Sequence, residues 1–384
     1  LDLKKRIRLS KVFVVVPMKV LAAMIMVVNS KLVKHYFYRY FSVCLLMLFT
    51  ACHNKTGDSS VIMTINVGDY QEDSFDWKSM FGNELHLVEL TDTSKEYSFT
   101  EISKLVFKKD KFYISDWATR RIIVFDLNGN PVFVLNRRGR GPEEYLQVTD
   151  FDVDNSGGLW ILDGQKDAVV HYSPELRFLS QSKTGDCQYS HIACSNENLL
   201  LSVAYWDKTE NGGYKAVAAD TNLNVTSRYG RIPEFYDPDF EFPSVGFSEI
   251  GDVLMYNNPI DDYVSVFESD EYKGDYYFDF GSKKVPDDVR KSVESHLESI
   301  ADYTFLVNAV GVYRDYVVGT MMEGGSPKDF IINMKSGKMY KQPWDEGTLH
   351  LSAISNDRII LSGTDVEADK DIVAYVSFDK LKTI

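Results

Sequence analysis

The feature that most constrains the fold is a short apolar run that recurs six times along the chain. The runs begin at residues 112, 159, 199, 253, 316 and 359, so successive starts lie 40 to 63 residues apart. A strand-like segment and a tight turn with Asp, Asn or Gly precede each run, and a second alternating run follows it. A fourth strand-like segment completes five of the six units. This repeat predicts an all-β fold, a six-bladed β-propeller with four-stranded antiparallel blades.

The two ends of the repeat region predict how the ring closes. The sixth unit supplies three strands before Ile384, whereas one additional strand-like segment, ELHLVEL at residues 84–90, precedes the first unit. An open ring would leave a strand edge free to pair with other chains. We therefore expect residues 84–90 to complete the last blade and place the propeller at residues 84–384.

An insertion lengthens the spacing between the fourth and fifth units. It begins with Pro286 and two aspartates, which favour a helix start. Apolar side chains then recur at helical spacing and predict a helical insertion over residues 286–301 that packs on the propeller. These side chains are Val289, Val293, Leu297 and Ile300.

The N-terminal region differs in charge from the rest of the chain. Residues 1–51 contain nine Lys or Arg and one Asp, which leaves 33 basic and 55 acidic residues in the remainder. The apolar run YFSVCLLMLFTA before Cys52 is too short to span a bilayer and is typical of a signal-peptide core. We expect residues 1–51 to be a signal peptide with an over-extended gene start; the alternative is an uncleaved anchor.

The stretch LFTAC resembles a bacterial lipobox, which would make Cys52 the lipidated first residue of the mature protein. Residues 52–83 would then be a lipid-anchored tether and lead-in. In enterobacterial lipoproteins, which this N-terminus resembles, an Asp at the second mature position implies retention in the inner membrane, and His53 stands there instead. The resemblance therefore implies a cell-envelope lipoprotein anchored in the outer membrane, on either its periplasmic or its outer surface. Cys187 and Cys194 could form a bridge or remain separate thiols.

The sequence contains no familiar catalytic or metal-binding motif. Walker-type loops, HExxH, paired CxxC, GxSxG and EF-hand patterns are all missing from it. We therefore predict no cofactor and no metal. The sequence does not indicate an oligomeric state. The 22 excess acidic residues beyond residue 51 would repel nucleic-acid phosphates, which excludes nucleic acid as an expected partner.

Topology supplies the candidate site residues, because propeller ligands bind on loops at the channel mouth. Trp and Tyr beside carboxylates and Arg suit a sugar or peptide, through ring stacking and paired hydrogen bonds. The alternative is that Asp116 and Asp163, which end equivalent strands, only bond the local backbone. The candidates are Asp116, Trp117, Arg120, Arg121, Arg138, Arg140, Glu144, Asp163, Tyr205, Trp206 and Asp207.

Two stretches resemble the six-bladed NHL-like β-propeller lipoproteins of Gram-negative bacteria. They are YISDWATRRIIVFDLNGN and RRGRGPEEYLQVTDFDVD. That family has a Gly-x-Gly-Pro-Gly-Glu-Tyr/Phe motif between blades one and two. Here Glu143 replaces the third glycine, while the matching residues are Gly139, Gly141, Pro142, Glu144 and Tyr145. The resemblance implies the propeller and the lipid anchor more than any activity.

Two functions remain open on the sequence alone. The favoured one is a membrane-tethered binding or scaffold module that recognises a protein partner or glycan at the channel mouth. The alternative is an extracytoplasmic propeller enzyme, a lyase or hydrolase with or without a metal, whose site lies in the central channel. The missing motifs favour binding without turnover.

Overall fold

The computed structural model describes residues 60–91, 95–196, 198–234, 236–240, 242, 244, 246–365 and 370–384. The expected signal peptide and the lipidation residue Cys52 lie outside these described residues. Within them, no helix combines the length and apolar character needed to cross a membrane.

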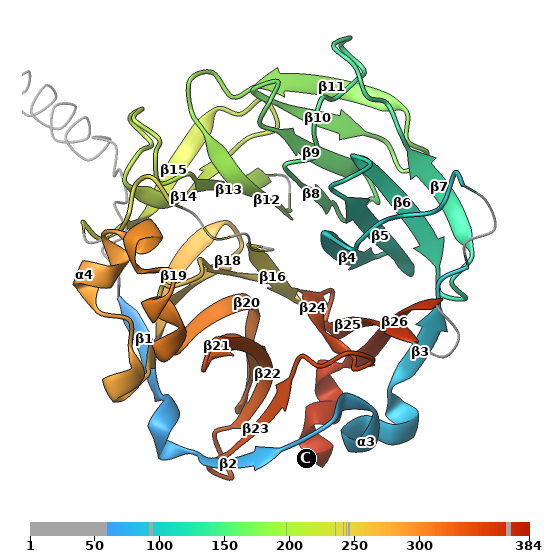
Figure 1. Cartoon of the computed structure of the whole chain (residues 1–384). Coiled ribbons are helices and arrows are strands. Elements are labelled where there is room, and N and C mark those ends of the chain that lie inside the picture. Colours follow the sequence, from blue (N-terminus) through green and yellow to red (C-terminus); the bar gives the residue numbers. More distant parts are fainter. Residues whose placement is uncertain are drawn as a thin grey trace, which may run out of the picture. The chain divides into compact units, whose positions relative to one another are not determined.

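Six sheets stand around a common axis, which confirms the predicted six-bladed β-propeller (Figure 1). The first three blades contain four strands each, paired in chain order. Blade one contains β4 (Lys104–Lys108), β5 (Lys111–Asp116), β6 (Arg121–Asp126) and β7 (Pro131–Leu135). Blade two contains β8 (Asp150–Val153), β9 (Leu159–Asp163), β10 (Ala168–Tyr172) and β11 (Phe178–Lys183). Blade three contains β12 (Tyr189–Ser195), β13 (Asn198–Val203), β14 (Tyr214–Ala219) and β15 (Val225–Arg231).

The remaining three blades each take one strand from the N-terminal segment. Blade four contains β16 (Phe247–Ile250), β17 (Val253–Asn257), β18 (Tyr263–Glu268) and β19 (Glu271–Asp279). Blade five contains β20 (Phe305–Tyr313), β21 (Tyr316–Glu323), β22 (Ser326–Asn333) and β23 (Lys338–Pro343). Blade six contains β24 (His350–Ser355), β25 (Arg358–Asp365) and β26 (Lys370–Ser377), followed by the 3-10 helix η6 (Phe378–Thr383).

The ring closes as the sequence predicts. Strand β3 (His86–Glu89) pairs antiparallel with β26 and becomes the fourth strand of blade six. Val88 lies opposite Val373, and both side chains are buried between blades six and one. A strand from the beginning of the propeller thus joins its last blade to its first.

Two further N-terminal strands were not predicted. Strands β1 (Val61–Asn66) and β2 (Gln71–Ser74) add in parallel to the outer edges of β19 and β23. With η1 (Val67–Asp69), α3 (Trp77–Phe81), η2 (Gly82–Glu84) and β3, they form an N-terminal belt, residues 61–89, along the outside of blades four, five and six (Figure 1). Residues 61–66 and 71–74 of the segment expected to be a tether and lead-in therefore belong to the sheets.

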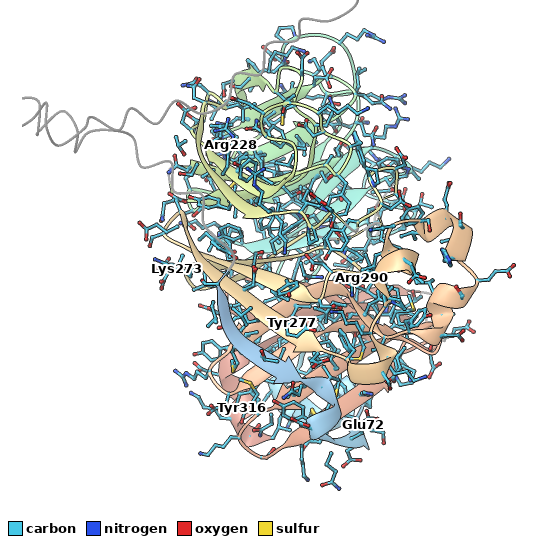
Figure 2. The ribbon with its side chains drawn as sticks, turned by 90° about the vertical axis from the view of Figure 1, so that its left-hand side faces the viewer. Glu72, Arg228, Lys273, Tyr277, Arg290 and Tyr316 are labelled. Atoms are coloured by element: carbon cyan, nitrogen blue, oxygen red, sulfur yellow. The ribbon has the colours of Figure 1, made fainter. Side chains whose placement is uncertain are left out.

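Side-chain contacts hold the belt in place. Trp77 is fully buried and donates through its indole Nε1 to Asp329 of blade five, at 2.9 Å. Glu72 of β2 lies 2.6 Å from the Lys341 ammonium of β23 (Figure 2). β2 has the sequence QEDS with all four side chains exposed, so only its backbone pairing marks it as a strand.

The hydrophobic core is divided into clusters between neighbouring blades. One cluster joins blades one and two, and others join two with three, three with four, and six with one. The largest joins blades four, five and six with the belt residues Trp77 and Phe81. Alternating apolar residues on adjacent sheets thus pack face to face, as expected of stacked twisted blades.

The insertion between blades four and five departs from the predicted continuous helix over residues 286–301. After η3 (Gly281–Lys283) it consists of α4 (Asp287–Arg290), η4 (Val293–His296) and η5 (Ser299–Asp302), because Ser292 leaves the helical region at φ −151°, ψ 60°. Three of the four expected side chains still pack on the propeller, but Leu297 is 49% exposed. Buried Arg290 of the insertion (Figure 2) binds Asp262 of blade four at 2.7 Å.

Candidate functional site on the connection face

All candidate site residues lie at one end of the blades. In an antiparallel four-stranded blade, the loop between the second and third strands lies at the same end as the connection to the next blade. We call this end the connection face. Residues 116–121, 138–144, 163 and 205–207 all belong to it. The topology thus places every candidate on one surface, and their contacts separate them into two groups.

Three aspartates of this set serve the local backbone. Asp116, Asp163 and Asp207 are buried, and each ends or follows the second strand of its blade. One carboxylate oxygen accepts from the chain entering the same blade, and the other accepts from amides two or three residues ahead. The entering donors are the amides of Thr100, Leu146 and Gln188, at 2.9, 2.6 and 2.7 Å. Asp116 and Asp163 therefore make the local backbone hydrogen bonds that the sequence offered as the alternative to ligand binding.

The glycine-rich connection between blades one and two is also held internally. The Glu144 carboxylate accepts from the Gly141 amide at 2.7 Å, and the buried Tyr145 hydroxyl donates to the Leu135 carbonyl at 2.9 Å. A Cβ on Gly139 would lie 2.0 Å from the Glu144 carboxylate. A larger residue at 139 would therefore displace the Glu144 carboxylate, which accepts from the Gly141 amide and shapes the loop.

The four arginines divide into two pairs. Arg120 donates to the Leu146 carbonyl at 3.3 Å, and Arg121 donates to two carbonyls of the segment preceding blade one. Both therefore tie one connection to another. Arg138 and Arg140, in contrast, are exposed. Their side chains are therefore open to solvent.

The aromatic candidates are displayed on the same face. Trp117 is 56% exposed in blade one, and Trp206 is 45% exposed in blade three. Tyr205 stacks on Tyr236 with 5.5 Å between ring centroids, so the Tyr205 ring packs within the protein. Large exposed aromatic rings are characteristic of binding surfaces.

The central channel is narrow where the first strands of the blades meet. A cavity of about 20 Å³ lies among them, bordered by Lys104, Asp152, Ile192, Glu249 and Ala353. A cavity of this size holds about one water molecule. This cavity is therefore too small for a sugar or a peptide.

A polar cluster, which we call the channel-entrance cluster, lies where these strands begin. The Lys104 ammonium is 2.7 Å from Asp150, whose other oxygen accepts from the Ile192 amide at 2.8 Å. The same oxygen lies 3.5 Å from His191 Nδ1, and His191 Nε2 lies 3.0 Å from Ser244 Oγ. Burial alone would raise the pKa of Asp150, but the neighbouring Lys104 and His191 lower it below its ordinary value.

A second polar group lies at the opposite end of the first strands. Lys108 pairs with Glu249, and the Asp152 carboxylate accepts from the Cys194 amide at 2.6 Å. Burial raises the pKa of Glu249 and raises the pKa of the Cys194 thiol well above its usual range. Cys187 and Cys194 are both free thiols. Across the described ranges, no group of three or more His, Cys, Asp or Glu is placed to hold a metal ion.

Sequence reasoning missed the channel-entrance cluster entirely. Its members come from β4, β8 and β12 and from the connection before β16, so they are far apart in sequence. A usable signal exists, because the first strand of a blade should be apolar where it packs and polar only where it faces the channel. Lys104, Asp150 and His191 are three of the polar residues in these first strands, which also contain Lys108 and Asp152.

Comparison with protein families finds one match, to a family model described as a six-bladed β-propeller, DUF5128, over residues 53–341. A search of the curated proteins finds no match to this sequence.

The search of solved structures finds matches at low sequence identity. A Bacteroides fragilis NCTC 9343 protein assigned as exported is 16% identical, with a TM-score of 0.66 over 82% of this chain and 99% of its own. A DUF4221 member from Bacteroides vulgatus ATCC 8482 is 12% identical, with a TM-score of 0.48 over 76% and 95%. Inactive Staphylococcus aureus virginiamycin B lyase with quinupristin is 13% identical, with a TM-score of 0.41 over 75% and 84%. The first of these supports the fold.

Proposed function

We propose that this chain, which belongs to the DUF5128 family of six-bladed β-propellers, is an envelope-tethered binding module that recognises a glycan or protein partner on its connection face. The observation that carries the proposal is the exposure of Trp117 and Trp206 on the face that also displays Arg138 and Arg140. The narrow channel supports a surface site over an internal one.

The exposed residues provide two complementary kinds of contact. An indole ring stacks on the apolar face of a sugar or covers a side chain of a protein partner. A guanidinium group forms paired hydrogen bonds to carboxylates or phosphates. Because Trp and Arg carry much of the energy of protein interfaces, these four residues are the expected centre of binding.

The binding proposal predicts a large effect of removing both indoles. Trp117→Ala with Trp206→Ala should weaken binding roughly 100-fold, since each truncated anchor costs about 1.4 kcal/mol or more. Glycan and peptide arrays would identify the ligand class, and isothermal titration would measure affinity.

The matched control is Leu179→Ser on the outer strand β11, where Leu179 is 54% exposed and distant in topology from the connection face. This control should bind as the unmodified chain does. Equal affinity of the double tryptophan variant and the control would refute the proposed surface.

The tether is the second part of the proposal. Lipid on Cys52, followed by the polar segment HNKTGDSS, would hold the propeller at a membrane, with the outer membrane favoured by His53. Cys52→Ser should abolish incorporation of labelled palmitate and release the protein from the membrane fraction. Membrane association that persists in this variant, without palmitate, would contradict lipid anchoring.

A further inference from the structure

We infer that Ser244 and His191, with Asp150 as the positioning residue, form an acyl-transfer site that cleaves carboxylic esters at the channel entrance of the connection face. This inference goes beyond the proposed binding and does not depend on it. None of its three side chains belongs to the proposed binding surface.

The serine and the imidazole are already within hydrogen-bond distance. Ser244 Oγ lies 3.0 Å from His191 Nε2, which is the contact that a nucleophile and its general base require. Ser244 belongs to the connection before β16 and is half-buried, so it borders the connection face. A serine hydroxyl becomes a nucleophile when an adjacent base accepts its proton.

The fold holds the imidazole in this position from several sides. The His191 amide donates to Ser202 Oγ at 2.8 Å, and the ring packs against Tyr256. The connection passes directly over the ring at Gly246, where φ is +73° and a Cβ would lie 2.4 Å from the imidazole. Glycine at 246 therefore permits the chain that carries Ser244 to approach the base.

Asp150 supplies the third group of the constellation. Its carboxylate lies 3.5 Å from His191 Nδ1, and within the described chain this buried nitrogen has no hydrogen-bond partner. A small rotation of the ring brings Nδ1 into hydrogen-bond range of that oxygen, and such contacts are often longer before substrate binds. Lys104, at 2.7 Å, keeps the carboxylate ionised, so it can orient the ring with Nδ1 protonated and Nε2 free to accept.

The chemistry that these groups support is ester hydrolysis in two steps. Ser244 Oγ bonds to the acyl carbon while His191 Nε2 takes the hydroxyl proton and then passes it to the departing alcohol oxygen. A water molecule then attacks the acyl-serine, giving its proton to the same nitrogen, which returns it to Ser244 Oγ. One ester and one water yield one carboxylic acid and one alcohol. The substrate class is therefore an acylated ligand, such as an O-acyl sugar or a lipid ester.

A fluorophosphonate probe tests the nucleophile on the intact chain. The expected result is covalent labelling of Ser244, located by mass spectrometry of the peptides, with loss of labelling in Ser244→Ala. His191→Gln should slow labelling at least about 100-fold, because an amide cannot accept the proton. Ser282→Ala replaces an exposed serine on another connection of the same face and should leave labelling unchanged.

Hydrolysis of p-nitrophenyl acetate tests the role of Asp150. Asp150→Asn is expected to lower the melting temperature, because the Asp150 carboxylate also pairs with Lys104, so kcat and KM are measured well below the melting transition. Under those conditions a positioning role lowers kcat and leaves KM unchanged, whereas unchanged kcat would show that Asp150 is purely structural. Circular dichroism at the assay temperature confirms that each variant remains folded. An unlabelled wild-type chain, or labelling that persists in Ser244→Ala, would overturn the inference and leave the 3.0 Å contact as a tie between the connection and blade three.

Discussion

A chain that begins at residue 91 is expected to lose its cooperative unfolding transition, because the deletion removes the strand that closes the ring. It would expose the whole edge of β26, which pairs with β3 at four positions. It would also remove Trp77, Phe81, Leu85, Val88 and Leu90 from the core. At about 1.5–3 kcal/mol for each buried side chain, this loss equals the whole stability of a typical domain.

A shorter deletion provides the control for this experiment. A chain that begins at Val67 loses only β1, the fifth strand of a blade whose other four strands are intact. It should melt at a lower temperature but with a single transition, since buried Ile65 is removed and the ring remains closed. Calorimetry would compare the two truncated chains with the chain that begins at residue 60. A cooperative transition retained from residue 91 would contradict closure by β3.

Asp329→Asn is expected to reduce the free energy of unfolding by about 4 kcal/mol, because Asp329 accepts hydrogen bonds from three parts of the fold. The side chain is fully buried in blade five. Its two oxygens accept from the indoles of Trp77 and Trp344, the Thr320 hydroxyl and the Leu351 amide, at 2.6 to 2.9 Å. An amide would direct its own N–H groups at two of these donors. Urea unfolding would measure the loss. As a control, Asp345→Asn at an exposed position should change the free energy of unfolding by less than about 0.5 kcal/mol.

The same carboxyl group predicts a pH dependence. Burial raises the pKa of Asp329 to about 6, although its four donors act in the opposite direction. In the unfolded chain the pKa is about 3.9, so the folded state binds the proton more tightly. Protonation of Asp329 therefore adds to the free energy of unfolding. This contribution is fully present below the pKa of the unfolded chain and is lost as pH rises through about 6. The stability difference between wild type and Asp329→Asn should therefore narrow by about 2 kcal/mol from pH 4.5 to pH 7. A constant difference would contradict the raised pKa.

Local sequence patterns were sufficient to predict the blades but not the belt. The apolar run at residues 159–163 matches β9, because alternation and turn residues specify a strand within a few residues. Strands β1 and β2 gain their structure from backbone pairing on edges more than 200 residues away, and β2 has no buried side chain. The insertion was recognised from its apolar spacing, which does not locate the break at Ser292.

The sequence predicted which face of the propeller carries the candidate residues, but not the contacts that each side chain makes. The face that carries Trp117, Trp206 and the exposed arginines follows from strand order alone. The internal roles of Glu144, Arg120 and Arg121 depend on contacts between separate connections, which no local pattern reveals. The contact between Ser244 and His191 joins two residues 53 positions apart and required the folded ring.

Tryptophan fluorescence gives the most direct test that the connection face is where this propeller binds its partner. Of the five tryptophans, Trp77 and Trp160 are buried and Trp344 is half-buried, whereas Trp117 and Trp206 are exposed and would change environment on binding. Titration with the ligand identified on the arrays should shift the emission to shorter wavelength in a saturable way, and Trp117→Phe with Trp206→Phe should abolish the shift. Saturable binding measured by calorimetry, with no change in wild-type emission, would place the partner elsewhere and contradict the proposed site.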